Sequence, residues 1–351
     1  MNAPRSSSPP STEIPAANLP AFDALFQALR LKGVVYFAQD FGAPWAMRFR
    51  ATEHARFHII LKGRCWMRIG GRTVELKTND LLVFPGSPDH VLGDGDESQA
   101  ALAPDARDVG AMIRAGTLRM EGGARTRMIS GHFEFDPQVR ALLLNSLPDM
   151  IKARARTSAN RSLVLALPAL MASEMRDRRP GGAVIVERLA EIFLVQVLRD
   201  HFEQLRACVH SERPSLMAAL FDPRLGAALH FMYADSAKAL TLAAIAAAAG
   251  MSRSAFALRF KQLTGERPMA HLAEWRLLRA TQLLVDGTLS IAQVATACGH
   301  RSAEGFSRAF KRRHGASPAQ WRQLNTSRRT APGDTAPTSS EQTTFVARGA
   351  A

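Results

Sequence analysis

The sequence predicts an α+β protein with a small N-terminal β-barrel, a helical packing segment and an all-α C-terminal domain. Three observations favour this class. Short apolar runs alternate with Gly and Pro turns from about residue 22 to residue 135, as strands of a barrel or jelly roll do. The apolar period becomes helical over residues 136–210. Residues 242–268 and 291–318 then repeat one pattern, which indicates a duplicated helical unit.

Composition sets the boundaries between these parts. Both ends of the chain are rich in Ser, Thr, Pro, Ala and Gly and lack an apolar period, which predicts disordered tails. The predicted segments are a tail at 1–18, a barrel domain at 19–135, a helical packing and dimerisation segment at 136–210, a linker at 211–216, the duplicated domain at 217–325 and a tail at 326–351.

Within the barrel domain, apolar runs predict strands, and Gly70-Gly71 predicts a two-residue hairpin turn because glycine tolerates positive φ. The acidic stretch Gly93–Asp108 predicts a surface loop. The predicted strands lie at Val34–Phe37, Phe57–Leu61, Cys65–Ile69, Thr73–Leu76 and Leu81–Phe84.

Two helices are predicted in the next segment, and both are too apolar to face water all round. They should pack on the barrel or on a second copy of the chain. The first opens at Pro137 and carries Val139, Leu142, Leu143 and Leu147 on one side, and the second carries Val186, Leu189, Phe193 and Val197.

Each copy of the repeat reads as a short apolar helix, a glycine turn, a second helix with phenylalanines four apart, and a Gly and Pro stop. Gly250 matches Gly299, Phe260 matches Phe310, and one residue is inserted after the first glycine of the second copy. Thr241, Ser252, Ser290 and Ser302 are the expected N-caps. This is the pattern of a helix-turn-helix, whose second helix enters a DNA major groove. A continuous helix at Met269–Val285 would hold the two units at a fixed spacing.

The face of each second helix opposite its phenylalanines combines small residues with cations, which suits base edges and phosphates. Glu304 could accept from a cytosine amino group or simply favour the helix N-terminus. The cations could also form an ordinary solvated face. The candidate DNA-binding residues are Arg253, Ser254, Ala257, Lys261, Arg301, Ser302, Ala303, Glu304, Arg308 and Lys311.

Charge supports a polyanionic partner. Lys and Arg number 45 against 31 Asp and Glu. Ser215–Asn325 holds 14 of these cations and 6 of the acids. The three cysteines show no metal-ligand spacing and read as reduced thiols. A polar N-terminus and the lack of a long apolar run predict a cytoplasmic protein without a membrane segment.

Residues 217–324 resemble the DNA-binding domain of the AraC/XylS family of transcription regulators, and GFSRAFKRRHGASPAQWR at 305–322 carries the likeness. One departure is Leu258, where the family commonly has Arg, with Arg259 beside it. The stretches GVVYFAQDFGAPWAMRF, FHIILKGRCWMRI and NDLLVFPGSPDHVL resemble the cupin-like sensor domain of one subgroup. The resemblance implies an effector-responsive activator that binds double-stranded promoter DNA, RNA polymerase and a small-molecule effector, as a homodimer.

A barrel of this kind could hold a metal, so a metal-dependent cupin-type enzyme is the alternative. His54, His58 and His90 are present, but Arg56 stands where a carboxylate ligand is expected and no His-x-His pair occurs. We therefore expect no metal, no cofactor and no catalytic residues. A third class, nonspecific DNA packaging, would need only charge. The residues that the resemblance puts near an effector are Trp45, Phe57, His58, Trp66 and His90.

Overall fold

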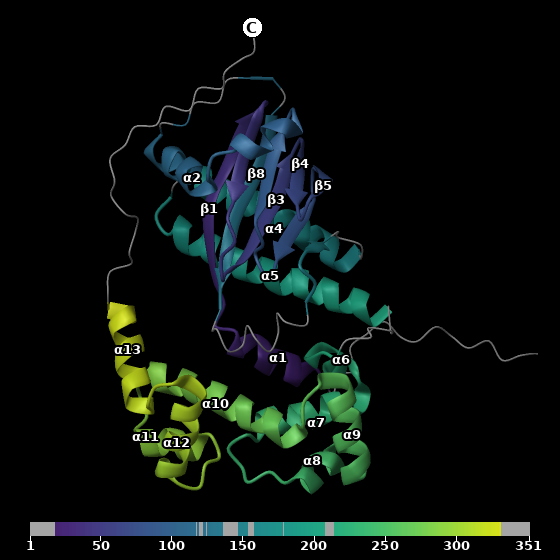
Figure 1. Ribbon diagram of the computed structural model, residues 1–351, viewed down its shortest axis with the longest axis vertical. Coiled ribbons are helices and arrows are strands. Elements are labelled where there is room, and N and C mark those ends of the chain that lie inside the picture. The colour runs from purple at the N-terminus through teal and green to yellow at the C-terminus, as the bar shows by residue number, and fades with distance from the viewer. Residues whose placement is uncertain are drawn as a thin grey trace, which may run out of the picture. The chain divides into compact units, whose positions relative to one another are not determined.

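The computed structural model describes residues 18–330 except for gaps at 117, 119–121, 124, 136–146, 154–157, 178 and 208–213. The described chain divides into two compact units (Figure 1). Residues 30–201 form the barrel unit, and residues 18–29 join the residues after 201 in the helical unit. Among the described helices, none combines the length and apolarity that crossing a bilayer requires.

The barrel unit contains two antiparallel sheets, one with strand order β1-β8-β3-β6-β9 and one with order β2-β7-β4-β5. The predicted strands and the Gly70-Gly71 turn are confirmed, since Ile69 pairs with Arg72 and both glycines have positive φ. The strands are β1 Lys32–Gly42, β2 Trp45–Phe49, β3 Ala55–Lys62, β4 Arg64–Ile69, β5 Arg72–Lys77, β6 Leu81–Phe84, β7 His90–Asp94, β8 Arg125–Glu134 and β9 Ile151–Ala153.

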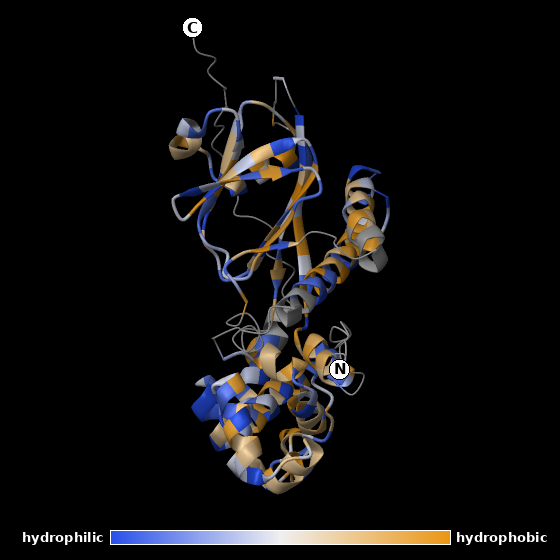
Figure 2. Cartoon of the chain, turned by 90° about the vertical axis from the view of Figure 1, so that its right-hand side faces the viewer, coloured by the Kyte–Doolittle hydropathy of each residue, from blue (hydrophilic) through white to orange (hydrophobic). Residues whose placement is uncertain are grey.

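The barrel core lies between the two sheets. Alternate residues of each strand point inward, as the two-residue period of a strand requires. Phe37, Phe49, Met67, Phe84 and Leu92 are among the buried side chains that fill it. In Figure 2 the strands are largely orange and the turns between them largely blue, so the alternation of apolar runs and polar turns in the sequence corresponds to strands and turns.

Helices α4 (Ser158–Asp177) and α5 (Gly182–Ala207) belong to the barrel unit and follow its strands in sequence (Figure 1). The outward-facing Phe57 stacks on Phe133 at 4.7 Å and lies 5.9 Å from Phe193 of α5, ring centre to ring centre. A Cβ on Gly33 would come within 2.6 Å of the Ala190 Cβ, so glycine lets β1 approach α5 closely. The predicted second helix and its packing on the barrel are thus confirmed, whereas the helix predicted at Pro137 lies outside the described residues.

The stretch Gly93–Asp108 was expected to be a loop, and this expectation is wrong for much of it. A 3-10 helix spans Glu97–Leu102, and α2 (Ala106–Ala115) begins within the stretch. Its aspartates act as caps, because Asp96 accepts from the Ser98 N–H and Asp105 accepts from the Arg107 N–H. Acids that suggested a solvent loop therefore start helices.

The helical unit begins with α1, at Leu19–Ala28, which was predicted to be part of the barrel domain. Asn18 was predicted to end a disordered tail, yet it is fully buried in this unit. Residues 326–330, also assigned to a tail, continue the last helix. The other helices are α6 Leu216–Phe221, α7 Pro223–Ala234, α8 Leu242–Ala248, α9 Arg253–Thr264, α10 Pro268–Asp286, α11 Ile291–Ala297, α12 Ala303–His314 and α13 Pro318–Thr330.

Candidate DNA-binding surface and effector site

The first helix-turn-helix is formed by α8 and α9. Thr241 and Ser252 cap the two helices by accepting from the Ala244 and Ala255 N–H groups. Gly250 has φ of +61°, a left-handed turn that glycine adopts without strain. Phe256 and Phe260 are fully buried, so the outer face of α9 is fixed by its core face.

The second helix-turn-helix, α11 and α12, repeats this construction. Ser290 and Gln293 form a capping box, and Ser302 caps α12 by accepting from the Gly305 N–H at 3.1 Å. A Cβ on Gly299 would lie 2.6 Å from the Ser236 carbonyl oxygen, which explains the glycine at this turn. Phe306 and Phe310 are buried against α10 residues. The caps and turns predicted from the repeat are confirmed.

Helix α10 joins the two helix-turn-helix units and extends one residue beyond each end of the predicted helix Met269–Val285. Trp275 of α10 stacks on Tyr233 with 3.9 Å between ring centres, and the Tyr233 hydroxyl lies 2.9 Å from His271 Nε2. The other ring nitrogen of His271 lies 3.2 Å from a Glu266 carboxylate oxygen, just past the end of α9. The buried contacts of His271 and Trp275 join α7 to α10, and the partly exposed Glu266 links His271 to the segment that follows α9.

The predicted DNA-binding residues lie on the outer faces of α9 and α12 and at their N-terminal ends. All of them are exposed except Ala257 and Ala303, which are half-buried. Within the described chain, no ion pair occupies the cations of this set, so their charge faces solvent. Arg313, which follows them on α12, is instead paired with Glu274. The cations among them are Arg253, Lys261, Arg301, Arg308 and Lys311.

Two neighbouring positions distinguish α9 from α12. Leu258 is 61% exposed on the side of α9 away from Phe256 and Phe260. The guanidinium of the neighbouring Arg259 donates to the Asp222 carboxylate, with Nε to Oδ2 at 3.0 Å and a second hydrogen bond from Nη2. The outer face of α9 therefore presents Leu258 at the position where the family that the sequence resembles commonly has arginine.

The barrel interior contains a hydrogen-bonded histidine pair. His58 Nε2 and His90 Nε2 are 2.8 Å apart. The Pro88 carbonyl can only accept, so His90 Nδ1, at 2.8 Å, carries the proton. His90 Nε2 then accepts from His58, whose Nδ1 accepts from the Ser130 hydroxyl at 2.8 Å. Burial lowers the pKa of His90 to about 4 and that of His58 well below its usual value, so both rings are neutral.

The other predicted effector residues do not gather around this pair. Trp45 faces a small apolar cavity that Val109 and Met112 of α2 also line. Phe57 points to the opposite side of its sheet, toward Phe193. Trp66 lies on the outer face of the other sheet and donates to the Gly95 carbonyl.

His54 is also apart from the histidine pair, since its ring lies 4.7 Å from that of His132. Within the described residues, no group of three His, Cys, Asp or Glu side chains is placed to hold a metal ion. Cys65 and Cys298 are buried free thiols, and burial raises the pKa of Cys298 to about 11.

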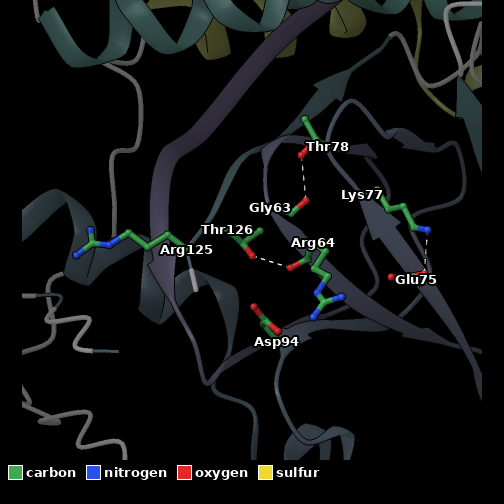
Figure 3. A pocket seen from close by; sticks show the side chains of 8 residues that line it. All are labelled: Gly63, Arg64, Glu75, Lys77, Thr78, Asp94, Arg125 and Thr126. Carbon is green, nitrogen blue, oxygen red and sulfur yellow. Dashed lines mark hydrogen bonds and ion pairs between the residues drawn. The ribbon is translucent and has the colours of Figure 1, made fainter. Parts of the chain in front are cut away.

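A pocket of about 520 Å³ lies where the β3–β4 turn meets the ends of β5 and β7 and the start of β8. Figure 3 shows the residues that line it. Arg64, Lys77 and Arg125 supply positive charge, whereas Glu75 and Asp94 supply negative charge. Lys77 pairs with Glu75 at 3.3 Å, and the Arg125 side chain points away from Arg64 and Asp94 (Figure 3). None of the predicted effector residues lines this pocket.

The sequence interpretation missed a polar cluster at the inner face of β1, β3 and β8. Arg56 is 5% exposed, its Nε has no hydrogen-bond partner, and its guanidinium lies 5.3 Å from the Phe49 ring centre. Tyr36 bonds to it, and His132 is its cross-strand neighbour. Burial lowers the pKa of Arg56 and lowers that of His132 to about 4. The sequence signal for this cluster was Arg56 itself, which stands where a carboxylate ligand was expected.

Comparisons with known proteins agree with both units. Residues 21–203 match the family model described as Cupin, and residues 245–324 match the model described as Helix-turn-helix domain. A putative AraC-like transcription regulator of Streptomyces lividans is 32% identical over 284 residues, covering 80% of this chain and 90% of that protein. The chain belongs to the AraC-like transcription regulators.

Further similar proteins are also described as regulators of transcription. The HTH-type transcriptional regulator AlkR of Acinetobacter baylyi is 28% identical, covering 86% of this chain and 99% of that one. The solved DNA-binding domain of AdpA in complex with a target DNA is 33% identical, covers 30% of this chain and 95% of that chain, and has a TM-score of 0.29. This AraC-like regulator is a DNA-binding transcription regulator and not an enzyme.

Proposed function

We propose that this regulator inserts α9 and α12 into successive major grooves of a promoter and activates transcription in response to a small molecule. The observation that carries the proposal is the pair of matching helices, each with small polar residues and solvent-facing cations opposite a buried phenylalanine pair. Helix α9 contacts α10, and the phenylalanines of α12 share a core cluster with α10 residues, so one element sets their spacing. Reading helices about 34 Å apart would meet one face of the duplex.

The residues divide into two roles. Those at the N-terminal ends of α9 and α12, such as Arg253 and Arg301, would contact base edges, because the N-terminal end of a reading helix lies deepest in the groove. Lys261, Arg308 and Lys311 lie farther along and would contact phosphates. Glu304 lies in the first turn of α12, where it can favour the helix N-terminus and still accept from a cytosine amino group.

Binding of the full chain to DNA tests this proposal. Sites selected from random duplexes should contain two half-sites one helical turn apart, and raising the salt should lower the affinity with a slope of several ions. A steep salt slope without sequence preference would indicate nonspecific packaging and contradict the proposal. Affinity that salt leaves unchanged would contradict it as well.

A homodimer through α4 and α5 forms the second part of the proposal. These helices pack on the sheet with one face, yet Leu163 and Leu170, seven residues apart, are 41% and 48% exposed. On α5, Val184, Ile185 and Ile192 are 42% to 58% exposed at a spacing of seven or eight. An apolar seam with this period suits a second copy of the same helices. Ile192→Glu should make the chain monomeric in sedimentation, whereas Ile192→Met should not.

An effector in the barrel unit would bias the dimer or the DNA-binding geometry, and RNA polymerase would be the partner that activation recruits. Of the residues predicted to bind the effector, His58 and His90 lie in the barrel interior and Trp45 belongs to the barrel core, whereas Phe57 and Trp66 face away from that interior. Genome-wide mapping of bound DNA would identify neighbouring genes, whose substrates form the panel of test ligands. A ligand from this panel should raise the melting temperature of the protein and change promoter output, and a full panel without either effect would contradict an effector role.

A further inference from the structure

The corner between α6 and α7 is held by a residue from the start of the chain. Asn18 is fully buried, and its Nδ2 donates to the Leu220 carbonyl at 2.8 Å and to the Asp222 carbonyl at 3.3 Å. Phe22 of α1 packs beside it, with its ring 5.2 Å from that of Phe221. The N-terminal segment thus packs in the helical unit, where Asn18 contacts Leu220, a residue 202 positions later in the sequence.

The packing of the Asn18 side chain depends on Gly226 of α7. A Cβ at that position would lie 2.1 Å from Asn18 Nδ2 and 2.2 Å from Asn18 Cγ. Only glycine leaves room for the amide, so the contact is a built feature of the packing. The side chain lies directly over the first turn of α7 because Gly226 has none.

Asp222 joins this corner to the first reading helix. One carboxylate oxygen caps α7 by accepting from the Arg224 and Leu225 N–H groups, both at 3.0 Å. The other oxygen accepts from Arg259 of α9. The Asp222 side chain is 7% exposed and that of Arg259 is 49% exposed, so the pair is partly shielded from water. A backbone bond from the Ser215 N–H to the Leu263 carbonyl, at 2.6 Å, adds a second link between α6 and α9.

The second reading helix has a different support. Arg313 of α12 pairs with Glu274 of α10, and both side chains are 40% or more exposed. An exposed pair of this kind contributes little, because solvent screens it. No residue from the N-terminal segment takes part in it. The two reading helices are therefore held in different ways, and within the described residues the ion pair of α9 is the one that adjoins the Asn18 contact.

We propose that Asn18, Asp222 and Arg259 are positioning residues that fix the orientation of α9 for its DNA half-site. This inference rests on the proposed reading role of α9 and α12. Loss of the network would let α9 turn relative to α10, while α12 keeps its place.

The test uses the full chain and a selected DNA site in which either half-site can be scrambled. Asp222→Asn keeps an oxygen for the α7 cap but removes the ion pair, and Arg259→Gln removes it from the other side. Asn18→Ala removes the anchor. In the wild type, scrambling either half-site should weaken binding. Each variant should bind the intact site about tenfold more weakly and should lose its response to scrambling of the α9 half-site only.

The double variant Asp222→Asn with Arg259→Gln should bind no more weakly than either single variant, because both remove one interaction. Glu274→Gln, which breaks the exposed pair on α12, is the matched control and should behave as the wild type. Thermal unfolding identifies the folded variants, and Arg259→Gln keeps the test valid if Asn18→Ala does not fold.

Three outcomes would overturn the inference. If Asp222→Asn leaves the affinity for DNA unchanged while Arg259→Gln lowers it, Arg259 acts as a phosphate contact and not through Asp222. Equal losses at both half-sites would indicate general destabilisation, and unchanged responses to scrambling would remove the positioning role. In each case a wild type that distinguishes its half-sites would leave the proposed function standing, whereas a wild type that ignores both would refute that function itself.

Discussion

The buried histidine pair of the barrel makes a quantitative prediction about stability and pH. His90 has a pKa of about 4 in the folded chain, against about 6.5 when unfolded. Between these values the unfolded state binds more protons, so the free energy of unfolding falls as the pH falls from about 6.5 toward 4. Below the folded pKa no further loss comes from this residue.

The loss between pH 7.5 and pH 5 is about 2 kcal/mol for His90 alone, as linkage gives for a shift of this size. His58 and His132 act in the same direction, because burial lowers their pKa values too. Protonation of His90 also replaces the Nε2···Nε2 hydrogen bond with two facing donors, because His90 Nε2 is the acceptor of that bond.

His90→Gln is the informative variant. Its amide oxygen can accept from His58 and its amide N–H can donate to the Pro88 carbonyl, but it does not titrate. Opening free energies of β3 and β7, measured by hydrogen exchange in urea and corrected for the intrinsic effect of pH, should fall less steeply in the variant, by about 2 kcal/mol between pH 7.5 and 5. Equal pH dependence in variant and wild type would refute the assignment.

Two further predictions concern DNA. Lys311→Ala should weaken binding to all sequences alike and reduce the salt slope by about one ion, since Lys311 is exposed and its proposed partner is a phosphate. Salt titrations on specific and random duplexes measure this, and a change in base preference would contradict it. If exposed Leu258 packs on a thymine methyl, uracil in place of thymine should cost the wild type about fourfold in affinity, the value of one buried methyl, and should cost Leu258→Ala nothing. Equal costs in both proteins would exclude that contact.

Local patterns made the helix-turn-helix units predictable. The caps at Thr241, Ser252, Ser290 and Ser302 and the turn at Gly250 depend on neighbours within a few residues, so the sequence contains them in full. The same holds for the Gly70-Gly71 hairpin. The outer faces of α9 and α12 followed from the four-residue spacing of their phenylalanines.

The barrel's polar interior could be predicted only in part. His58 and His90 were singled out together, yet their spacing of 32 residues does not say that two strands from different sheets bring their rings to 2.8 Å. Phe57 and Trp66 face outward because pairing with distant strands sets which residues of each strand point inward. A one-residue change in register would reverse this choice. The sequence showed Arg56 at the position where a carboxylate ligand was expected. Its burial became evident only from the fold.

By itself the sequence determined the duplication, the reading faces and the class of protein, because helix periodicity, caps and glycine turns are local and repeat at fixed spacing. Tertiary structure alone decided that Asn18, assigned to a tail, is buried on Gly226 in the helical unit. It also decided that Arg259 binds Asp222 while Leu258 faces outward. Such contacts join residues tens to hundreds of positions apart, and their geometry depends on how whole helices pack, which no local pattern records.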